Sequence, residues 1–237
     1  MVYGIRIVLL CLLVVFVLPF GLIAGLISPR NPRWNAIFIR PYSRLALPIL
    51  GIKFTLSGAG HLDLKEPAII IANHQHRFDI ALLMYLLPKR CVILAKSAVM
   101  WIPITGWLFW LWGNIAVRRK DKKNRHAAMK SLAEVLKRRQ ASLWIFPEGS
   151  RYQGTSLNSF KDGAFELAYE NNRPIVAIVA SPYAHQVKVS AWRSAFINIT
   201  VLPPIHPKNF ADAESLKISC HEKMNSIFEA YQASDGV

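Results

Sequence analysis

A histidine and an aspartate five positions apart are the clearest candidates for chemistry in this chain of 237 residues. Residues 73–79 read NHQHRFD, and they directly follow residues 67–72, an apolar run typical of a buried strand. A tight turn could bring the Asp79 carboxylate to one imidazole nitrogen of His74, which leaves the other nitrogen to accept a proton. The pair predicts a general base, although a plain helix N-cap at Asp79 and a structural turn residue at His74 also fit the pattern.

A second polar cluster, Glu148-Gly149-Ser150-Arg151, follows another apolar run at residues 142–146. The planar guanidinium of Arg151 suits a phosphate group bidentately, Gly149 lets the backbone approach a ligand closely, and Ser150 can donate a hydrogen bond. The cluster predicts an anion site. The alternative is an ordinary turn in which Glu148 and Arg151 pair in solvent, which contributes little energy.

A third candidate is strongly basic. Residues 113–120 read GNIAVRRK and open a stretch, ending at Arg139, that holds ten basic residues against Asp121 and Glu134. Two or three of these cations could hold a phosphate group or a carrier, and the others could lie on anionic lipid, where each contributes about 1 kcal/mol. A solvated basic face is the alternative interpretation for any single lysine.

The elements that must position these residues follow an α/β pattern, in which short β-branched runs alternate with longer helical periods. The sequence predicts a mostly parallel central sheet flanked by helices and preceded by an N-terminal hydrophobic membrane-anchoring helix or helical pair. Strands are expected at residues 67–72, 91–95, 142–146, 174–180, 186–190 and 198–201, and helices at 79–87, 124–140 and 213–232.

The N-terminal segment is apolar enough to meet lipid, because residues 7–29 carry no charge. The segment could cross a hydrocarbon core about 30 Å thick, or Pro19, Gly21 and Gly25 could break it into two helices that dip into one leaflet. A cleaved signal is less favoured, since the run is long and lacks a small-x-small cleavage site. Arginines follow the segment, whereas only Arg6 and the terminal amine precede it, so we expect the remaining chain in the cytoplasm, on a bacterial inner membrane. We predict an anchor with a basic juxtamembrane segment at 1–50 and an α/β domain at 51–237.

A second uncharged stretch covers residues 97–117 and holds four tryptophans, at positions 101, 107, 110 and 112. Proline, glycine and asparagine residues interrupt the stretch, and a span here would split the α/β domain. Tryptophan favours the level of the lipid headgroups. We therefore expect a segment that faces the membrane or lines an acyl chain, with a second membrane span as the alternative.

Composition limits the classes of partner. The chain is 53% hydrophobic and 18% charged, and its net charge of +15 favours anionic partners. Membrane lipid is expected rather than nucleic acid, because the basic residues adjoin tryptophan-rich chain and no nucleic-acid motif is present. The three cysteines lie far apart, which supports neither a disulfide framework nor a thiolate metal site. No metal is expected.

Five blocks together resemble the glycerolipid acyltransferase family. Residues 73–79 match its NH-x4-D signature, residues 146–151 (FPEGSR) match its FPEG[TS]R block, and residues 113–119 match G-x-I-x-[IV]-x-R. Residues 160–165 (FKDGAF) and 174–179 (PIVAIV) resemble the FK-x-GAF and PIVPV segments. The blocks occur in the family's order across most of residues 56–204.

The resemblance implies a 1-acylglycerol-3-phosphate O-acyltransferase, which makes phosphatidic acid from lysophosphatidic acid and an acyl thioester. His74 would take the proton of the sn-2 hydroxyl and Asp79 would hold His74. By the same similarity, Arg119 and Arg151 would bind the acceptor phosphate, while Glu148, Gly149 and Ser150 would shape the glycerol pocket. Acyl-CoA or acyl carrier protein would serve as the donor substrate, with no further cofactor.

Two alternatives remain at this point. The chain departs from the family pattern at His76, Asp162 and Ala177, so the acceptor could instead be another lysophospholipid or a lyso-aminolipid. An alternative of another class is a non-catalytic peripheral membrane protein whose basic face binds anionic lipid. Substitution of His74 separates these classes, because only an enzyme should lose turnover.

Overall fold

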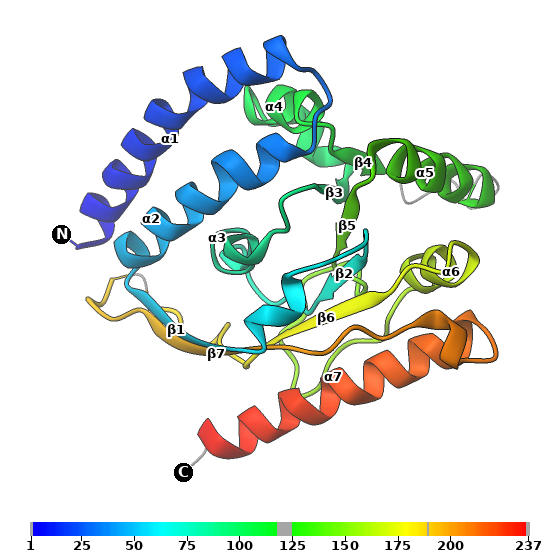
Figure 1. Cartoon of the computed structure of the whole chain (residues 1–237). Coiled ribbons are helices and arrows are strands. Elements are labelled where there is room, and N and C mark those ends of the chain that lie inside the picture. Colours follow the sequence, from blue (N-terminus) through cyan, green and yellow to red (C-terminus); the bar gives the residue numbers. More distant parts are fainter. Residues whose placement is uncertain (1, 118–124, 189, 236–237) are drawn as a thin grey trace.

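A central sheet runs through the middle of the molecule, with helices on either side of it (Figure 1). The computed structural model describes residues 2–117, 125–188 and 190–235. The described strands form one seven-stranded sheet in the order β1-β7-β6-β2-β5-β3-β4. All neighbouring pairs are parallel except β6 with β7. The strands are β1 (Ile52–Ser57), β2 (Ile69–Ala72), β3 (Cys91–Lys96), β4 (Ile115–Val117), β5 (Ser142–Ile145), β6 (Ile175–Ala180) and β7 (Ala195–Val201).

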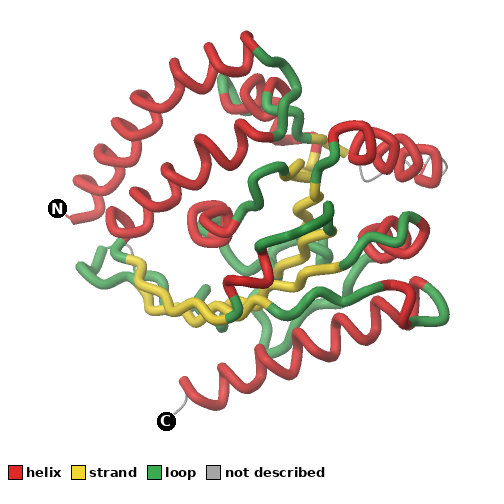
Figure 2. Tube along the Cα trace, in the orientation of Figure 1, coloured by secondary structure: helices red, strands yellow, loops and turns green. Residues whose placement is uncertain are grey.

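Helices cover both faces of this sheet, as the tube in Figure 2 shows. On one face, α2 (Arg40–Leu50) and α3 (Asp79–Leu83) pack on alternate residues of the central strands, including Ile70 and Val176. On the other face, α5 (Arg125–Arg139), α6 (Gly163–Glu170) and α7 (Ala213–Asp235) cover the intervening residues, including Ile69 and Ala177. Burial on both faces explains why the central strands read as continuous apolar runs.

The N-terminal helix α1 (Val2–Ile27) lies outside α2 and packs on α4 (Thr105–Leu111). It contacts α4 closely at Gly21 and Gly25, where an added Cβ would meet Trp112 and Leu111 at 2.7 and 3.1 Å. Most of its remaining side chains are exposed and apolar. By length and composition α1 could cross a membrane, and only 6% of its most apolar window is buried.

The fold class predicted from the sequence is confirmed, and the predicted strands at 67–72, 91–95, 142–146, 174–180 and 198–201 match β2, β3, β5, β6 and β7. The strand expected at 186–190 is wrong. Its described residues lie in turns and irregular backbone, in which the N–H of Gln186 bonds the Tyr183 carbonyl and that of Ala191 bonds the Lys188 carbonyl. Both edges of β7 are already paired, with β1 and β6, so the alternating segment finds no edge there.

The predicted helices at 124–140 and 213–232 correspond to α5 and α7, but the helix expected at 79–87 is shorter. It ends as an α-helix at Leu83 and continues as the 3₁₀ turn η3 (Met84–Leu86). Part of the predicted segment 1–50, helix α2, belongs to the packed core through Ala46, Leu47 and Leu50. The boundary between an anchor and a domain at residue 50 stays a prediction.

The second uncharged stretch is not one long helix. It forms the 3₁₀ turn η4 (Ser97–Trp101), helix α4 and strand β4, so its proline and glycine residues divide it as expected. Trp101 and Trp107 are 85% and 69% exposed, whereas Trp112 is 7% exposed. The stretch therefore presents some tryptophans outward and uses Trp112 to pack α1 against the body of the protein. The remaining short elements are the π-helix η1 (Asn35–Ile39) and the 3₁₀ turns η2 (Ala59–Leu62) and η5 (Pro207–Asn209).

Candidate active site

The structure brings His74 and Asp79 into contact at the carboxyl end of β2. His74 lies two residues beyond the strand, and Asp79 is the first residue of α3. The His74 Nδ1 and Asp79 Oδ2 atoms are 2.5 Å apart. The His74 side chain is 20% exposed and that of Asp79 is 1% exposed. The imidazole thus has a buried partner on one side and access to solvent on the other.

Asp79 is held by several donors at once. Its Oδ2 atom accepts the backbone N–H groups of Gln75 and His76 at 2.8 and 2.9 Å, and its Oδ1 atom accepts the hydroxyl of Tyr183. A carboxylate that receives these hydrogen bonds acts as an acceptor, so Nδ1 of His74 carries the proton that it donates to Asp79. The Nε2 atom of His74 is then unprotonated and can accept a proton from a substrate.

Tyr183 is a site residue that the sequence analysis missed. It is fully buried after strand β6, and its hydroxyl donates to Asp79. Burial raises the pKa of Tyr183 well above its ordinary value, and the neighbouring Asp79 carboxylate raises it further. Tyr183 therefore remains a hydrogen-bond donor across the whole physiological pH range. No short-range motif marks this tyrosine, because it lies 104 positions after Asp79.

Two amides tie the His74 turn to strand β6. The Asn73 side chain donates to the Ala180 carbonyl at 3.0 Å and accepts the Ala180 N–H at 2.9 Å. The Gln75 amide donates to the carbonyls of Ala180 and Ser181 and accepts the N–H of Tyr183. Because β2 and β6 are parallel neighbours, their carboxyl ends meet, and these amides fix the residues on both sides of His74.

The His74 ring is also held by stacking. The ring of Phe146, which follows β5, lies 4.2 Å from the His74 ring between centroids, with an interplanar angle of 18°. The backbone N–H of Tyr152 donates to the His74 carbonyl at 2.8 Å. The segment after β5 thus restrains both the ring and the backbone of His74, so its orientation is set before a substrate arrives.

Glu148 lies inside the site rather than on its rim. It is 3% exposed, and its Oε1 atom accepts the backbone N–H of His74 at 2.7 Å while Oε2 accepts that of Asn158 at 3.4 Å. Burial raises the pKa of Glu148 to about 7, although both hydrogen bonds act in the opposite direction. The structure therefore places Glu148 on the His74 backbone, and its predicted contact with a glycerol group stays a prediction.

The other predicted ligand residues form the outer part of this region. Gly149 has a φ angle of +74°, which favours glycine and closes the turn through its N–H to the Phe146 carbonyl at 3.0 Å. Ser150 and Arg151 are exposed. Burial lowers the pKa of His76, and the positive charges of Arg77 and Arg151 lower it further against the opposing effect of Asp79. The charge of Arg151 therefore reaches the His74 turn, whereas Arg119 lies outside the described residues.

The chemistry of the site is that of a general base without a metal ligand set. Within residues 2–117, 125–188 and 190–235, no group of three histidine, cysteine or acidic side chains could hold a metal ion. The imidazole, held by its buried carboxylate, can deprotonate a hydroxyl. The nearby cationic Arg151 can bind an anionic group next to that hydroxyl. This combination suits group transfer to an alcohol.

Comparison with known proteins agrees with this chemistry. A family model described as Acyltransferase matches residues 53–181, which hold all of the site residues described above except Tyr183. The chain belongs to the Acyltransferase family. The resemblance that the five sequence blocks indicate is confirmed, and the observed His74–Asp79 contact belongs to a member of this family.

The chain aligns with curated members of this family over most of its length. The chain is 30% identical over 221 residues to the 1-acyl-sn-glycerol-3-phosphate acyltransferases of Salmonella typhimurium and Escherichia coli, covering 93% of this chain and 90% of each relative. It is 33% identical over 184 residues to human 1-acyl-sn-glycerol-3-phosphate acyltransferase alpha, covering 76% of this chain and 65% of that protein.

A solved structure supports the fold of the acyltransferase. The crystal structure of the 1-acyl-sn-glycerophosphate acyltransferase PlsC from Thermotoga maritima matches with a TM-score of 0.72 and 21% identity. The match covers 98% of both chains, so it includes the N-terminal helices as well as the sheet.

Proposed function

We propose that this acyltransferase moves a fatty acyl group from an acyl thioester to the sn-2 hydroxyl of 1-acylglycerol-3-phosphate, which gives phosphatidic acid. The observation that carries the proposal is the His74–Asp79 pair, in which Nδ1 donates to a buried carboxylate and Nε2 is left to act as a base. The curated bacterial relatives, which align over 93% of this chain, are 1-acyl-sn-glycerol-3-phosphate acyltransferases, and this supports the choice of acceptor.

In this mechanism His74 Nε2 takes the proton of the acceptor hydroxyl while the hydroxyl oxygen attacks the thioester carbonyl. Asp79 stabilises the imidazolium that forms, and Tyr183 and the backbone N–H groups keep the carboxylate in place. The C–S bond of the thioester breaks, and the imidazolium returns its proton to the leaving thiolate. Because the acceptor is itself the nucleophile, no acyl-enzyme is needed.

The surrounding residues would position the acceptor. Arg151, exposed beyond the Gly149 turn, would bind the acceptor phosphate, and Arg119 would assist. Gly149 and Ser150 would shape the space for glycerol. Glu148, whose carboxyl group accepts the His74 N–H, would act mainly as a positioning residue. Holding both substrates at one imidazole lowers the entropic cost of bringing them together.

Location and donor follow as parts of the proposal. Helix α1 would keep the enzyme at the membrane, with the α/β domain on the cytoplasmic face, as expected from the basic residues that follow α1. Acyl-CoA or acyl carrier protein would supply the acyl group, and neither requires a resident cofactor.

The test uses the purified full chain in detergent micelles, a panel of lyso-lipids and a labelled acyl donor, supplied as acyl-CoA or acyl carrier protein. Lysophosphatidic acid should be acylated fastest, and His74→Ala should lower kcat by about 10³-fold or more. The matched control His206→Ala removes an imidazole next to η5 and should retain activity. Preferred acylation of another lyso-lipid would overturn the acceptor, and full activity of His74→Ala would overturn the mechanism.

A further inference from the structure

A cluster of four arginines surrounds a cavity on the opposite edge of the sheet from His74. Arg90 directly precedes β3, and Arg139 ends α5 just before β5, so both lie at the amino ends of these parallel strands. Arg30 and Arg33 come from the turn between α1 and η1. The cavity has a volume of about 250 Å³ and is lined by Arg30, Asn31, Pro32, Arg33, Arg90 and Arg139.

The pocket is positively charged without internal compensation. Of the described residues that line it, four carry a positive charge and none carries a carboxylate. No acidic side chain in the described part of the chain forms an ion pair with these arginines. Burial lowers the pKa of Arg139, and the positive charges of Arg138 and Arg30 lower it further. Bringing these cations together costs free energy that a bound anion would offset.

Two of the arginines are fixed by the fold. The Arg139 Nη1 atom donates to the Gly113 carbonyl at 2.6 Å, and the backbone N–H of Arg30 donates to the Leu111 carbonyl at 2.6 Å. Gly113 allows this approach because it has a φ of +79° and any Cβ there would lie 2.6 Å from the Arg30 carbonyl oxygen. The pocket is therefore built by close packing of the α1–η1 turn on the start of β4.

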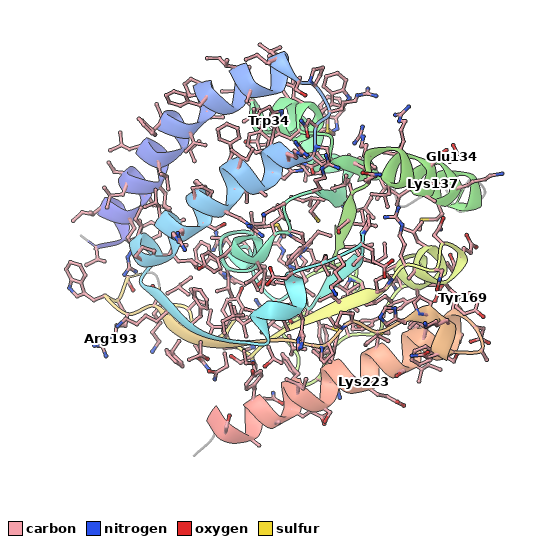
Figure 3. All side chains as sticks on the ribbon, viewed as in Figure 1. Trp34, Glu134, Lys137, Tyr169, Arg193 and Lys223 are labelled. Carbon is pink, nitrogen blue, oxygen red and sulfur yellow. The ribbon has the colours of Figure 1, made fainter. Side chains whose placement is uncertain are left out.

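Apolar and aromatic side chains flank the pocket. The Arg30 guanidinium lies 4.7 Å from the ring centroid of Trp110, which is 45% exposed. Trp107 on the same helix and Ile27 at the end of α1 are also exposed. Trp34, labelled in Figure 3, lies in the same region and donates its indole N–H to the Ser28 carbonyl at 3.0 Å. A tryptophan-rich apolar rim beside guanidinium groups is the arrangement that a lipid headgroup and its first acyl carbons fit.

We propose that the pocket formed by Arg30, Arg33, Arg90 and Arg139 binds the phosphate group of an anionic phospholipid of the membrane. The site is separate from catalysis, because β5 separates Arg139 at its amino end from Glu148 beyond its carboxyl end. An acyl donor held here would have to reach around the sheet to His74. A membrane lipid needs no such reach, and its binding would fix how α1 and α4 lie on the bilayer.

Arg33 and Arg90 are the positions to change, because Arg30 and Arg139 also hold the fold together. The probe is dihexanoyl phosphatidylglycerol, titrated into the full chain in micelles while thermal shift reports binding. Phosphatidylglycerol avoids the proposed product, which would occupy the active site. The double variant Arg33→Gln, Arg90→Gln should bind about 25-fold more weakly, at about fivefold per basic residue.

The control variant Lys208→Gln, Lys223→Gln removes the same charge from another part of the surface. Both lysines are exposed, and Figure 3 shows Lys223 on α7, across the molecule from Trp34. The control should bind phosphatidylglycerol within twofold of the wild type. Both proteins should bind dihexanoyl phosphatidylcholine much more weakly than phosphatidylglycerol. Acylation in micelles should stay unchanged in both variants, since neither touches the His74 site.

Several results would overturn the proposal. Equal affinity of the wild type and the arginine variant would exclude the pocket as the site. Equal losses in both variants would show a general charge effect. Tight binding of inorganic phosphate without lipid would assign the pocket to a free anion instead. Should the double variant fail to fold, the single variants Arg33→Gln and Arg90→Gln should each weaken binding about fivefold, and unchanged affinity in both would exclude the pocket.

Discussion

The two edges of the central sheet, at the carboxyl and the amino ends of its parallel strands, differ in how their charged side chains are compensated. At the carboxyl edge, Asp79 is buried and receives donors from His74, Tyr183 and two backbone N–H groups. At the amino edge, four arginines line an open cavity, and none of the described residues that line it carries a carboxylate. A buried charge that is fully hydrogen-bonded gives a rigid, preorganised site, whereas uncompensated surface charge gives affinity for an external ion. The difference separates a reaction centre from a docking site within one sheet.

The largest test of this comparison is Asp79→Asn at the carboxyl edge. An asparagine amide cannot hold the same imidazole tautomer, because it presents an N–H group as well as an acceptor to Nδ1 and its neighbours. We expect kcat to fall by about 10³- to 10⁴-fold in steady-state acylation assays. Binding of phosphatidylglycerol at the amino edge should be unchanged, and loss of both functions together would indicate misfolding rather than a catalytic defect.

Glu148→Gln tests how burial acts on a charge in the reaction centre. The native pKa is raised to about 7 from an ordinary value of 4.5, so the folded state binds the proton more tightly than the unfolded state. Stability is therefore lost as the pH rises from 4.5 to about 7. Relative to Glu148→Gln, the wild type should lose up to about 3 kcal/mol over this window. Denaturation of both proteins at pH 5 and pH 8 measures the difference, and parallel pH profiles would contradict the assignment.

Arg151→Ala tests whether the carboxyl edge also holds an exposed cation for substrate. A charged hydrogen bond of about 1.5–3 kcal/mol predicts that KM for lysophosphatidic acid rises about 10- to 100-fold, with a smaller change in kcat. Initial rates across acceptor concentrations separate the two parameters. The control Arg193→Ala removes another exposed arginine and should leave KM within twofold.

Tyr183→Phe is the smallest expected change, because it removes a single donor from a carboxylate that keeps three others. We expect kcat to fall about tenfold, in line with the loss of a hydrogen bond to a charged group. The informative measurement is the pH dependence of kcat, which should shift to higher pH because a less stabilised Asp79 carboxylate interacts more strongly with the imidazolium. A uniform loss of activity at every pH would indicate a merely structural role.

Much of the fold was predictable because strands that are buried on both faces consist of continuous apolar residues. Residues 69–72 and 175–180 are buried on both faces of the sheet, which produces the apolar runs from which β2 and β6 were predicted. Strand β1, in contrast, alternates between buried and exposed positions and contains Lys53 and Thr55, so its sequence resembles a surface segment. The three-residue strand β4 is too short for any periodicity to develop.

The reaction centre was predictable only where its residues are neighbours in sequence. His74 and Asp79 share one turn, so their spacing alone suggested a contact. Asn73, Gln75 and Tyr183 act across the β2–β6 pairing, and Phe146 and Glu148 act across β2–β5. Their roles depend on which strands become neighbours. The order β6-β2-β5 is a property of the folded chain that local spacing does not contain.

The clip formed by Asn73 and Gln75 has a consequence during synthesis. Asn73 bonds backbone groups of Ala180, and Gln75 bonds those of Ala180, Ser181 and Tyr183, all more than 100 residues later in the chain. A nascent polypeptide that has emerged from the ribosome as far as α3 already carries the imidazole and its carboxylate, but the residues that Asn73 and Gln75 bond are not yet made. Catalytic competence must therefore arrive late in translation, after α1 has already emerged.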